Sequence, residues 1–68
     1  MEENLNLYRI FYAVANTGNI SKAARQLFIS QPSISKSISR LENILDTRLF
    51  IRTSRGVRLT EEGQLLYS

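Results

Sequence analysis

The chain has 68 residues, of which 43% are hydrophobic and 22% are charged. We therefore expect one small globular domain instead of a disordered chain. Cysteine and histidine are absent. This absence excludes disulfides, Cys/His zinc sites, thiol nucleophiles and the commonest general base, so we expect no enzyme activity, no metal and no cofactor.

The sequence contains no apolar run long enough to cross a bilayer. Its N-terminus begins with the acids Glu2 and Glu3 and lacks the basic and apolar regions of an export signal. We therefore expect a cytoplasmic protein that does not contact a membrane.

The positive charge is concentrated in two stretches that contain no acids. The formal net charge is +3 and the sequence pI is about 9.8. This pattern is typical of a surface that binds a polyanion, although charge alone leaves a merely solvated basic surface open. The cations are Arg9, Lys22, Arg25, Lys36 and Arg40 in the first stretch and Arg48, Arg52, Arg55 and Arg58 in the second.

Apolar residues at helical spacing predict a first helix over residues 5–15. We expect Asn4 or Asn6 to cap its start. Gly18 can adopt the left-handed conformation that closes a helix, so we expect the helix to end there. The expected apolar face consists of Leu7, Tyr8, Phe11, Val14 and Ala15.

A second, short helix is expected to begin at Ser21, whose hydroxyl can cap the first turn and, secondarily, bind a phosphate. Its buried stripe contains Ala23, Ala24 and Leu27, with Phe28 also assigned to the core. The small alanines allow another helix to cross closely, as a tight pair of helices requires.

Ser30 is expected to cap a third helix over about residues 31–45, again with phosphate binding as a second role. Pro32 fits its first turn, where the backbone amides have no intrahelical partner. The helix has one apolar and one polar, cationic face. The apolar face is predicted to contain Ile34, Ile38, Leu41 and Leu45, and the opposite face Ser33, Lys36, Arg40 and Asn43.

After Asp46 the pattern becomes extended, which predicts strands at residues 49–52 and 57–59 joined by a turn at 53–56. Thr60 is expected to cap a last helix, with Glu61 and Glu62 at its positive end. Leu65, Leu66 and Tyr67 then begin an apolar face. We also expect Glu42 to make a local ion pair, for instance with Arg48.

This order of elements is that of a mainly α winged helix-turn-helix, with a three-helix core and a two-stranded β wing. We expect this domain at residues 1–60 and the start of a fourth, linker helix at 61–68. The third helix would enter the major groove of duplex DNA, and the wing, at about 49–59, would follow the backbone or the minor groove. The alternative is a winged-helix protein interaction module, which would need apolar anchors on the polar face of the third helix.

Two segments carry a family resemblance. They are ISKAARQLFISQPSISKSISRLE at residues 20–42 and LFIRTSRGVRLTEEG at residues 49–63. In the order and spacing of their residues they closely resemble the N-terminal domain of the LysR-type transcriptional regulators. The resemblance covers nearly the whole chain from Leu5 onward, and such an ordered set is far more specific than the Ser-Gln-Pro triplet alone.

The resemblance implies a bacterial transcription regulator whose complete chain continues through a dimerising linker helix into a ligand-sensing domain. Such regulators bind double-stranded DNA as homodimers or tetramers in the bacterial nucleoid. A small-molecule effector would bind only the further domain.

The resemblance also implies which residues of this chain contact DNA, at the start of the third helix and in the wing. Lys36 stands where the family often has arginine, which changes the bases that are read because lysine is a flexible point donor. The contacts implied position by position are Gln31, Pro32, Ser35, Lys36 and Arg55. The full predicted site adds Ser21, Ser30, Ser33, Arg40 and Arg52 from the polar helix faces, the helix starts and the hairpin.

Overall fold

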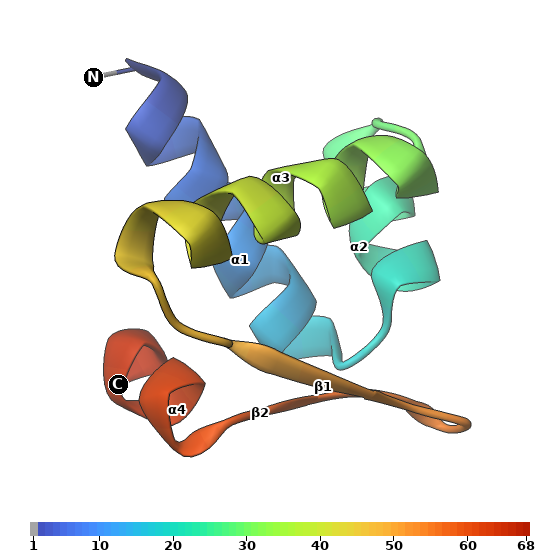
Figure 1. Ribbon diagram of the computed structural model, residues 1–68. Coiled ribbons are helices and arrows are strands. Elements are labelled where there is room, and N and C mark those ends of the chain that lie inside the picture. Colours follow the sequence, from blue (N-terminus) through green and yellow to red (C-terminus); the bar gives the residue numbers. More distant parts are fainter. Residues whose placement is uncertain (1) are drawn as a thin grey trace.

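The computed structural model describes the backbone of residues 2–68 and the side chains of residues 5–68. Its elements are α1 (Glu2–Thr17), α2 (Ile20–Leu27), α3 (Gln31–Leu45), β1 (Phe50–Thr53), β2 (Gly56–Leu59) and α4 (Glu61–Tyr67). Figure 1 shows α1, α2 and α3 on one side of the hairpin and α4 at the end of the hairpin opposite its turn. The expected winged helix-turn-helix is confirmed. None of the described helices combines the length and apolar character that crossing a bilayer requires.

The first helix begins earlier than the sequence predicts. Because α1 starts at Glu2, Asn4 and Asn6 lie inside it, and the prediction that one of them caps its start is wrong. The predicted end is confirmed, since Gly18 has a φ of +67°. The Gly18 amide donates to the carbonyl of Val14 at 2.8 Å.

The cap of α2 is Asn19 and not Ser21. The Asn19 side chain accepts a hydrogen bond from the Lys22 amide at 3.1 Å, and its own backbone is extended, with a φ of −153°. Ser21 lies within the helical first turn, where its hydroxyl oxygen accepts from the Gln31 side chain instead of capping the helix. The prediction that Ser21 is the cap is therefore wrong, because α2 begins at Ile20.

Phe28 lies outside the core, contrary to the sequence-based assignment. It is the residue that ends α2, in the left-handed conformation with a φ of 58°, and its side chain is 94% exposed. Its amide still donates to the carbonyl of Ala24, which closes the helix. The backbone reversal at this residue takes the ring off the apolar stripe. The core assignments of the other aromatic residues are confirmed, with Phe11 buried and Tyr8 half-buried against the core, and Phe50 in β1 is buried as well.

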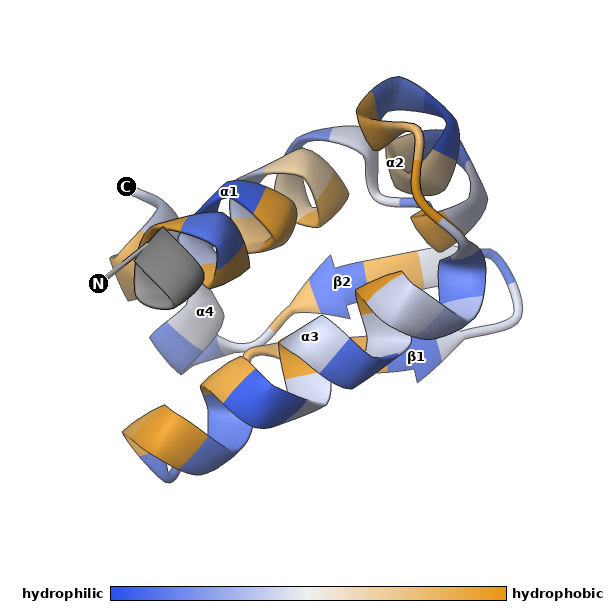
Figure 2. Ribbon diagram, turned by 90° about the horizontal axis from the view of Figure 1, so that it is seen from above, coloured by the Kyte–Doolittle hydropathy of each residue, from blue (hydrophilic) through white to orange (hydrophobic). Residues whose placement is uncertain are grey.

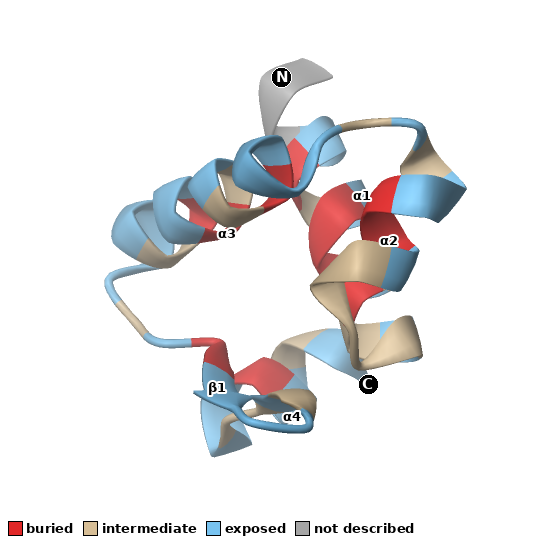
Figure 3. Ribbon diagram, turned by 90° about the vertical axis from the view of Figure 1, so that its right-hand side faces the viewer, coloured by how far each residue is buried: buried red, intermediate tan, exposed pale blue. Residues whose placement is uncertain are grey.

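The core lies where the three helices meet the start of the wing. Figure 3 shows the buried residues on the facing sides of α1, α2 and α3, and Figure 2 shows apolar and polar residues alternating along α3. Within α3 the stripe is confirmed at Ile34, Ile38 and Leu41 but not at Leu45, which is 37% exposed in the last turn. The buried hydrophobic residues are Leu7, Ile10, Phe11, Val14, Ala23, Ala24, Ile34, Ile38, Leu41, Leu49 and Phe50.

The start of α3 follows the prediction. Ser30 is its N-cap, and its hydroxyl oxygen accepts from the Ser33 amide at 3.3 Å. Pro32 occupies the first turn, where it removes no helical hydrogen bond.

The wing is an antiparallel hairpin fixed to the turn between α1 and α2. The strands pair from Phe50 opposite Leu59 to Thr53 opposite Gly56, and their bounds differ by one residue from those predicted at three of the four ends. Gly56 has a φ of +134°, and a Cβ there would collide with the carbonyl oxygen of Gly18. The Val57 amide donates to that same oxygen at 3.1 Å. Glycine at position 56 therefore lets the hairpin approach the helices closely enough to be hydrogen-bonded to them.

Glu42 connects α3 to the wing. Its Oε2 atom accepts hydrogen bonds from the amides of Leu49 at 2.7 Å and Phe50 at 3.3 Å. The sequence-based prediction of a local ion pair for Glu42 is wrong, because this carboxylate accepts from two backbone amides instead. The end of α3 is thus tied to the residues where β1 begins.

The last helix is anchored on both sides. Thr60 is its N-cap, as expected, and its Oγ1 accepts from the Gly63 amide at 3.0 Å. Gly63 is buried, and a Cβ at this position would collide with the carbonyl oxygen of Leu49. On the other side, the Tyr12 hydroxyl donates to the carbonyl of Leu66 at 3.2 Å.

The apolar face expected at residues 65–67 is divided between α1 and solvent. Leu66 is half-buried against the core, and the Tyr67 ring contacts Phe11 and Tyr12. Leu65 is 77% exposed. Only part of the face therefore remains uncovered by the described residues.

We predict that Leu41→Ala destabilises the domain by about 2 to 5 kcal/mol, because it leaves a cavity in the centre of the core. Leu45→Ala is the matched control and should change the free energy of unfolding by about 0.5 kcal/mol, since Leu45 is partly exposed. Thermal and urea unfolding followed by circular dichroism measures both. Equal losses in the two variants would contradict the described burial of α3.

Glu42→Gln should destabilise the domain by about 1 to 2 kcal/mol, because a neutral amide oxygen accepts hydrogen bonds more weakly than a carboxylate. Glu62→Gln, which removes an exposed charge in the first turn of α4, serves as the control and should cost about 0.5 kcal/mol. Urea unfolding of the two variants side by side tests the expectation. A Glu42→Gln protein as stable as the parent would show that the wing is held by other contacts.

Candidate nucleic-acid interface

The predicted site residues are distributed over the helix-turn-helix and the wing. Ser21 lies in the first turn of α2, Ser30 caps α3, Arg52 lies on β1 and Arg55 lies in the hairpin turn. Ser21 and Ser35 are half-buried and the others are exposed. The members on α3 are Gln31, Pro32, Ser33, Ser35, Lys36 and Arg40.

The two helices of the helix-turn-helix are joined by a hydrogen bond between predicted site residues. The Gln31 side-chain nitrogen donates to the Ser21 hydroxyl oxygen at 2.9 Å. Ser30 and Ser33 form a second contact at the start of α3, with 2.9 Å between their hydroxyl oxygens. These contacts fix polar side chains of both helices on one exposed surface.

The wing is joined to the same surface through Arg52. Its guanidinium Nη2 donates to the Ser35 hydroxyl oxygen at 2.9 Å, between residues 17 positions apart in the chain. A groove lies between the two helices and the hairpin at this point. Its lining includes Asn19, Ser21, Gln31, Arg52, Thr53 and Gly56.

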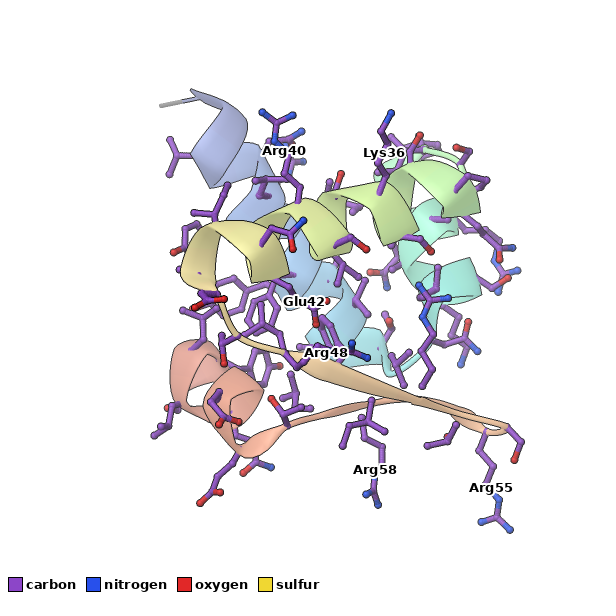
Figure 4. All side chains as sticks on the ribbon, viewed as in Figure 1. Lys36, Arg40, Glu42, Arg48, Arg55 and Arg58 are labelled. Carbon is purple, nitrogen blue, oxygen red and sulfur yellow. The ribbon has the colours of Figure 1, made fainter. Side chains whose placement is uncertain are left out.

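Arg52 is the cation of the site that lines this groove, and the other cations of the site lie outside its lining. Figure 4 shows Lys36 and Arg40 projecting from the side of α3 away from the hairpin, whereas Arg55 and Arg58 project from the hairpin in the opposite direction. Lys36 and Arg40 line a second groove beside α1, together with Asn6 and Ser33. The structure thus brings Ser21, Gln31, Ser35 and Arg52 together and leaves the other cations at the periphery.

The exposed face of α3 is polar before its last turn, where Ile44 and Leu45 are exposed. It carries no acid until Glu42, whose carboxylate accepts from the amides of Leu49 and Phe50. Such a face can donate hydrogen bonds to acceptors without repelling an anion.

Helical spacing places Ser39 on this face as well, four residues after Ser35. Ser39 is exposed and lines a groove with Arg48 and Arg52. It is not among the site residues predicted from the sequence. The spacing of four residues between Ser35 and Ser39 is the signal by which the sequence could have identified Ser39.

Comparison with protein families finds one that covers most of the chain. Residues 5–64 match the model of the bacterial regulatory helix-turn-helix protein, lysR family. The chain is 46% identical over 65 residues to the HTH-type transcriptional regulator GltR of Bacillus subtilis, spanning 96% of this chain and 22% of GltR. It is 48% identical over 62 residues to the HTH-type transcriptional regulator PerR of Escherichia coli, spanning 91% of this chain and 21% of PerR.

Solved structures agree with the sequence comparison. The CbnR DBD–DNA complex matches with a TM-score of 0.88 and 37% identity, covering 91% of this chain and 71% of that chain. The complex of the BenM DBD with catB site 1 DNA matches with a TM-score of 0.89 and 41% identity, covering 93% and 71%. The family match, the relatives and the shared fold together establish that this chain belongs to the lysR family of bacterial regulatory helix-turn-helix proteins.

Proposed function

We propose that this chain binds duplex DNA sequence-specifically, as the DNA-binding domain of a LysR-type transcriptional regulator, with α3 in the major groove and the wing on the backbone or in the minor groove. The observation that carries the proposal is the polar surface on which Gln31 and Ser35 are held by Ser21 and Arg52. The two similar structures that contain DNA support it. An α-helix with short hydroxyl, amide and cationic side chains suits the major groove.

The start of α3 is proposed to read base edges. Gln31, Ser35 and Lys36 supply an amide, a hydroxyl and a cation close to one another along the helix. Pro32 stiffens the first turn, on which Gln31 lies and which Ser35 and Lys36 follow directly. Lysine donates to the acceptors of guanine as a point charge. Lys36 is therefore the residue we assign to a guanine.

Phosphate contacts are proposed to surround the base contacts. The hydroxyls of Ser21, Ser30 and Ser33 stand at helix starts, where oriented amides favour an anion. Arg40 on α3 and Arg55 in the hairpin turn extend the surface to either side. Contacts of this kind position the protein and make binding salt-dependent.

The alternative of a protein interaction module has weaker support. Binding interfaces between proteins are usually centred on aromatic or aliphatic anchors. The outward face of α3 has Lys36, Ser39, Arg40 and Asn43 in exposed positions. This composition favours DNA as the partner of α3.

The properties of the whole regulator are also proposals, because the chain spans 22% of GltR and 21% of PerR. We propose that residues 1–60 form the DNA-binding domain and that α4 begins a linker helix. That helix would pair two protomers, and a further domain would bind a small-molecule effector. The exposed Leu65 is available to such an interface. A regulator that acts on bacterial DNA would work in the cytoplasm, at the nucleoid.

Selection from a pool of random DNA duplexes tests the central proposal. The 68-residue chain should enrich a short common sequence, and titration with the enriched and a scrambled duplex should give different dissociation constants. Enrichment of no sequence, with equal affinity for both duplexes, would contradict sequence-specific binding.

Lys36→Ala and Arg55→Ala should change DNA binding in different ways, the first through sequence preference and the second through affinity for every sequence. Loss of Lys36 should relax the preference at one or two base pairs, by about 1 to 3 kcal/mol. Loss of Arg55 should lower affinity on every sequence and reduce the slope of log affinity against log salt by about one. Titrations on single-base variants of the selected site, at two salt concentrations, distinguish these results. A uniform loss in Lys36→Ala would remove that residue from base reading.

A version of the protein extended beyond residue 68 should bind a palindrome about 10² to 10⁴ times more tightly than this chain, because pairing makes the second binding event intramolecular. The measurement is a pair of titrations at one salt concentration, each on a full palindrome and on a half-site. Equal affinity of the two proteins for the palindrome would contradict pairing through the linker helix.

A further inference from the structure

We infer that Arg52 acts on base recognition through Ser35, by biasing the Ser35 hydroxyl toward donating its hydrogen bond to the DNA. Arg52 is on this view a positioning residue of the wing, and Ser35 is the residue that touches the base. The inference rests on the proposed function, in which α3 enters the major groove.

The chemistry of the two groups fixes the direction of their hydrogen bond. The Nη2 atom of Arg52 lies 2.9 Å from the Oγ atom of Ser35. A guanidinium has five N–H donors and no acceptor, so the Ser35 oxygen must accept. The hydroxyl proton then points away from the guanidinium and remains the one donor that Ser35 can offer.

The contact with Arg52 also biases Ser35 toward donating. Hydrogen bonds in a chain polarise one another, so a hydroxyl that accepts from a cation becomes a stronger donor and a weaker acceptor. Ser35 alone could donate to the acceptors of guanine, adenine or thymine, or accept from the amino group of adenine or cytosine. With Arg52 in place, it favours N7 or O6 of guanine, N7 of adenine or O4 of thymine, and disfavours the amino group of cytosine.

The wing holds Arg52 at the required place. Arg52 lies opposite Val57 in the hairpin, and the Val57 amide is hydrogen-bonded to Gly18. The strand on which Arg52 lies is tied to α3 through Glu42 at its start. The guanidinium therefore approaches Ser35 from an element that is fixed at both ends.

Removing the Arg52 side chain should leave the domain folded. Arg52 is exposed, and a hydrogen bond in contact with water contributes little to the stability of the fold. Changes in the DNA binding of a folded variant can then be assigned to the altered side chain at the surface and not to unfolding. Circular dichroism of each variant checks this condition.

The test is a double-mutant cycle on DNA, with the parent, Ser35→Ala, Arg52→Ala and the double variant at one salt concentration. Single-base variants of the selected duplex identify the base pair at which Ser35→Ala relaxes the preference. Arg52→Ala should relax the preference at that same base pair about three- to tenfold, and the double variant should lose no more than the stronger single variant.

Two further variants separate positioning from simple loss of charge. Arg58→Ala removes an exposed arginine from the neighbouring strand and should leave the preference at the Ser35 base pair intact. Arg52→Lys keeps a cationic donor and should retain more of the preference than Arg52→Ala.

Other results would overturn the inference. Additive losses in the double variant would mean that Arg52 contacts DNA independently of Ser35. A uniform loss of affinity in Arg52→Ala, with every base preference kept, would make Arg52 a phosphate contact. A parent chain without any sequence preference would instead remove the proposed function itself, which the selection experiment detects separately.

Discussion

The placement of the wing depends on the carboxylate of Glu42. It accepts from the amides of Leu49 and Phe50, where the chain turns from the end of α3 into β1. A hairpin of two strands is at best marginally stable in water by itself, so its direction must come from contacts with the helices. The charged acceptor on α3 supplies one contact at the start of the hairpin, and the Gly18 carbonyl supplies another to Val57. The placement of the wing beside α3, on which the proposed DNA recognition depends, follows from these hydrogen bonds at Glu42 and Gly18.

Most of the fold could be predicted because its signals are local. Helical spacing, caps and the glycine-containing turn each depend on neighbouring residues. The stripe of Ile34, Ile38 and Leu41, the caps at Ser30 and Thr60 and the turn before Gly56 are confirmed. The errors lie at positions where the sequence allows two possibilities and the backbone conformation selects one of them. Asn19 and Ser21 both carry a capping oxygen, and only the start of α2 selects between them. Phe28 continues the apolar stripe in the sequence, but its left-handed conformation turns the ring toward solvent.

The candidate site could be predicted as a set of residue types but not as a set of contacts. The polar face of α3 follows from spacing along one helix. The hydrogen bonds of Gln31 with Ser21 and of Arg52 with Ser35 join different elements, and no spacing rule within one element reports such pairs. The same limit explains why the partners of Glu42 were missed, since its carboxylate binds amides that follow a change from helix to strand.

The close contact at Gly63 has a mechanical consequence for the proposed regulator. With no Cβ, Gly63 lets α4 lie directly against the Leu49 carbonyl, and this fixes the direction in which the helix leaves the domain. A helix rises about 1.5 Å per residue, so a tilt of about 10° at Gly63 would displace a point 20 residues further along by roughly 5 Å. That displacement exceeds the rise of about 3.4 Å between adjacent base pairs. The permitted separation of two half-sites would therefore depend on a glycine that touches no DNA.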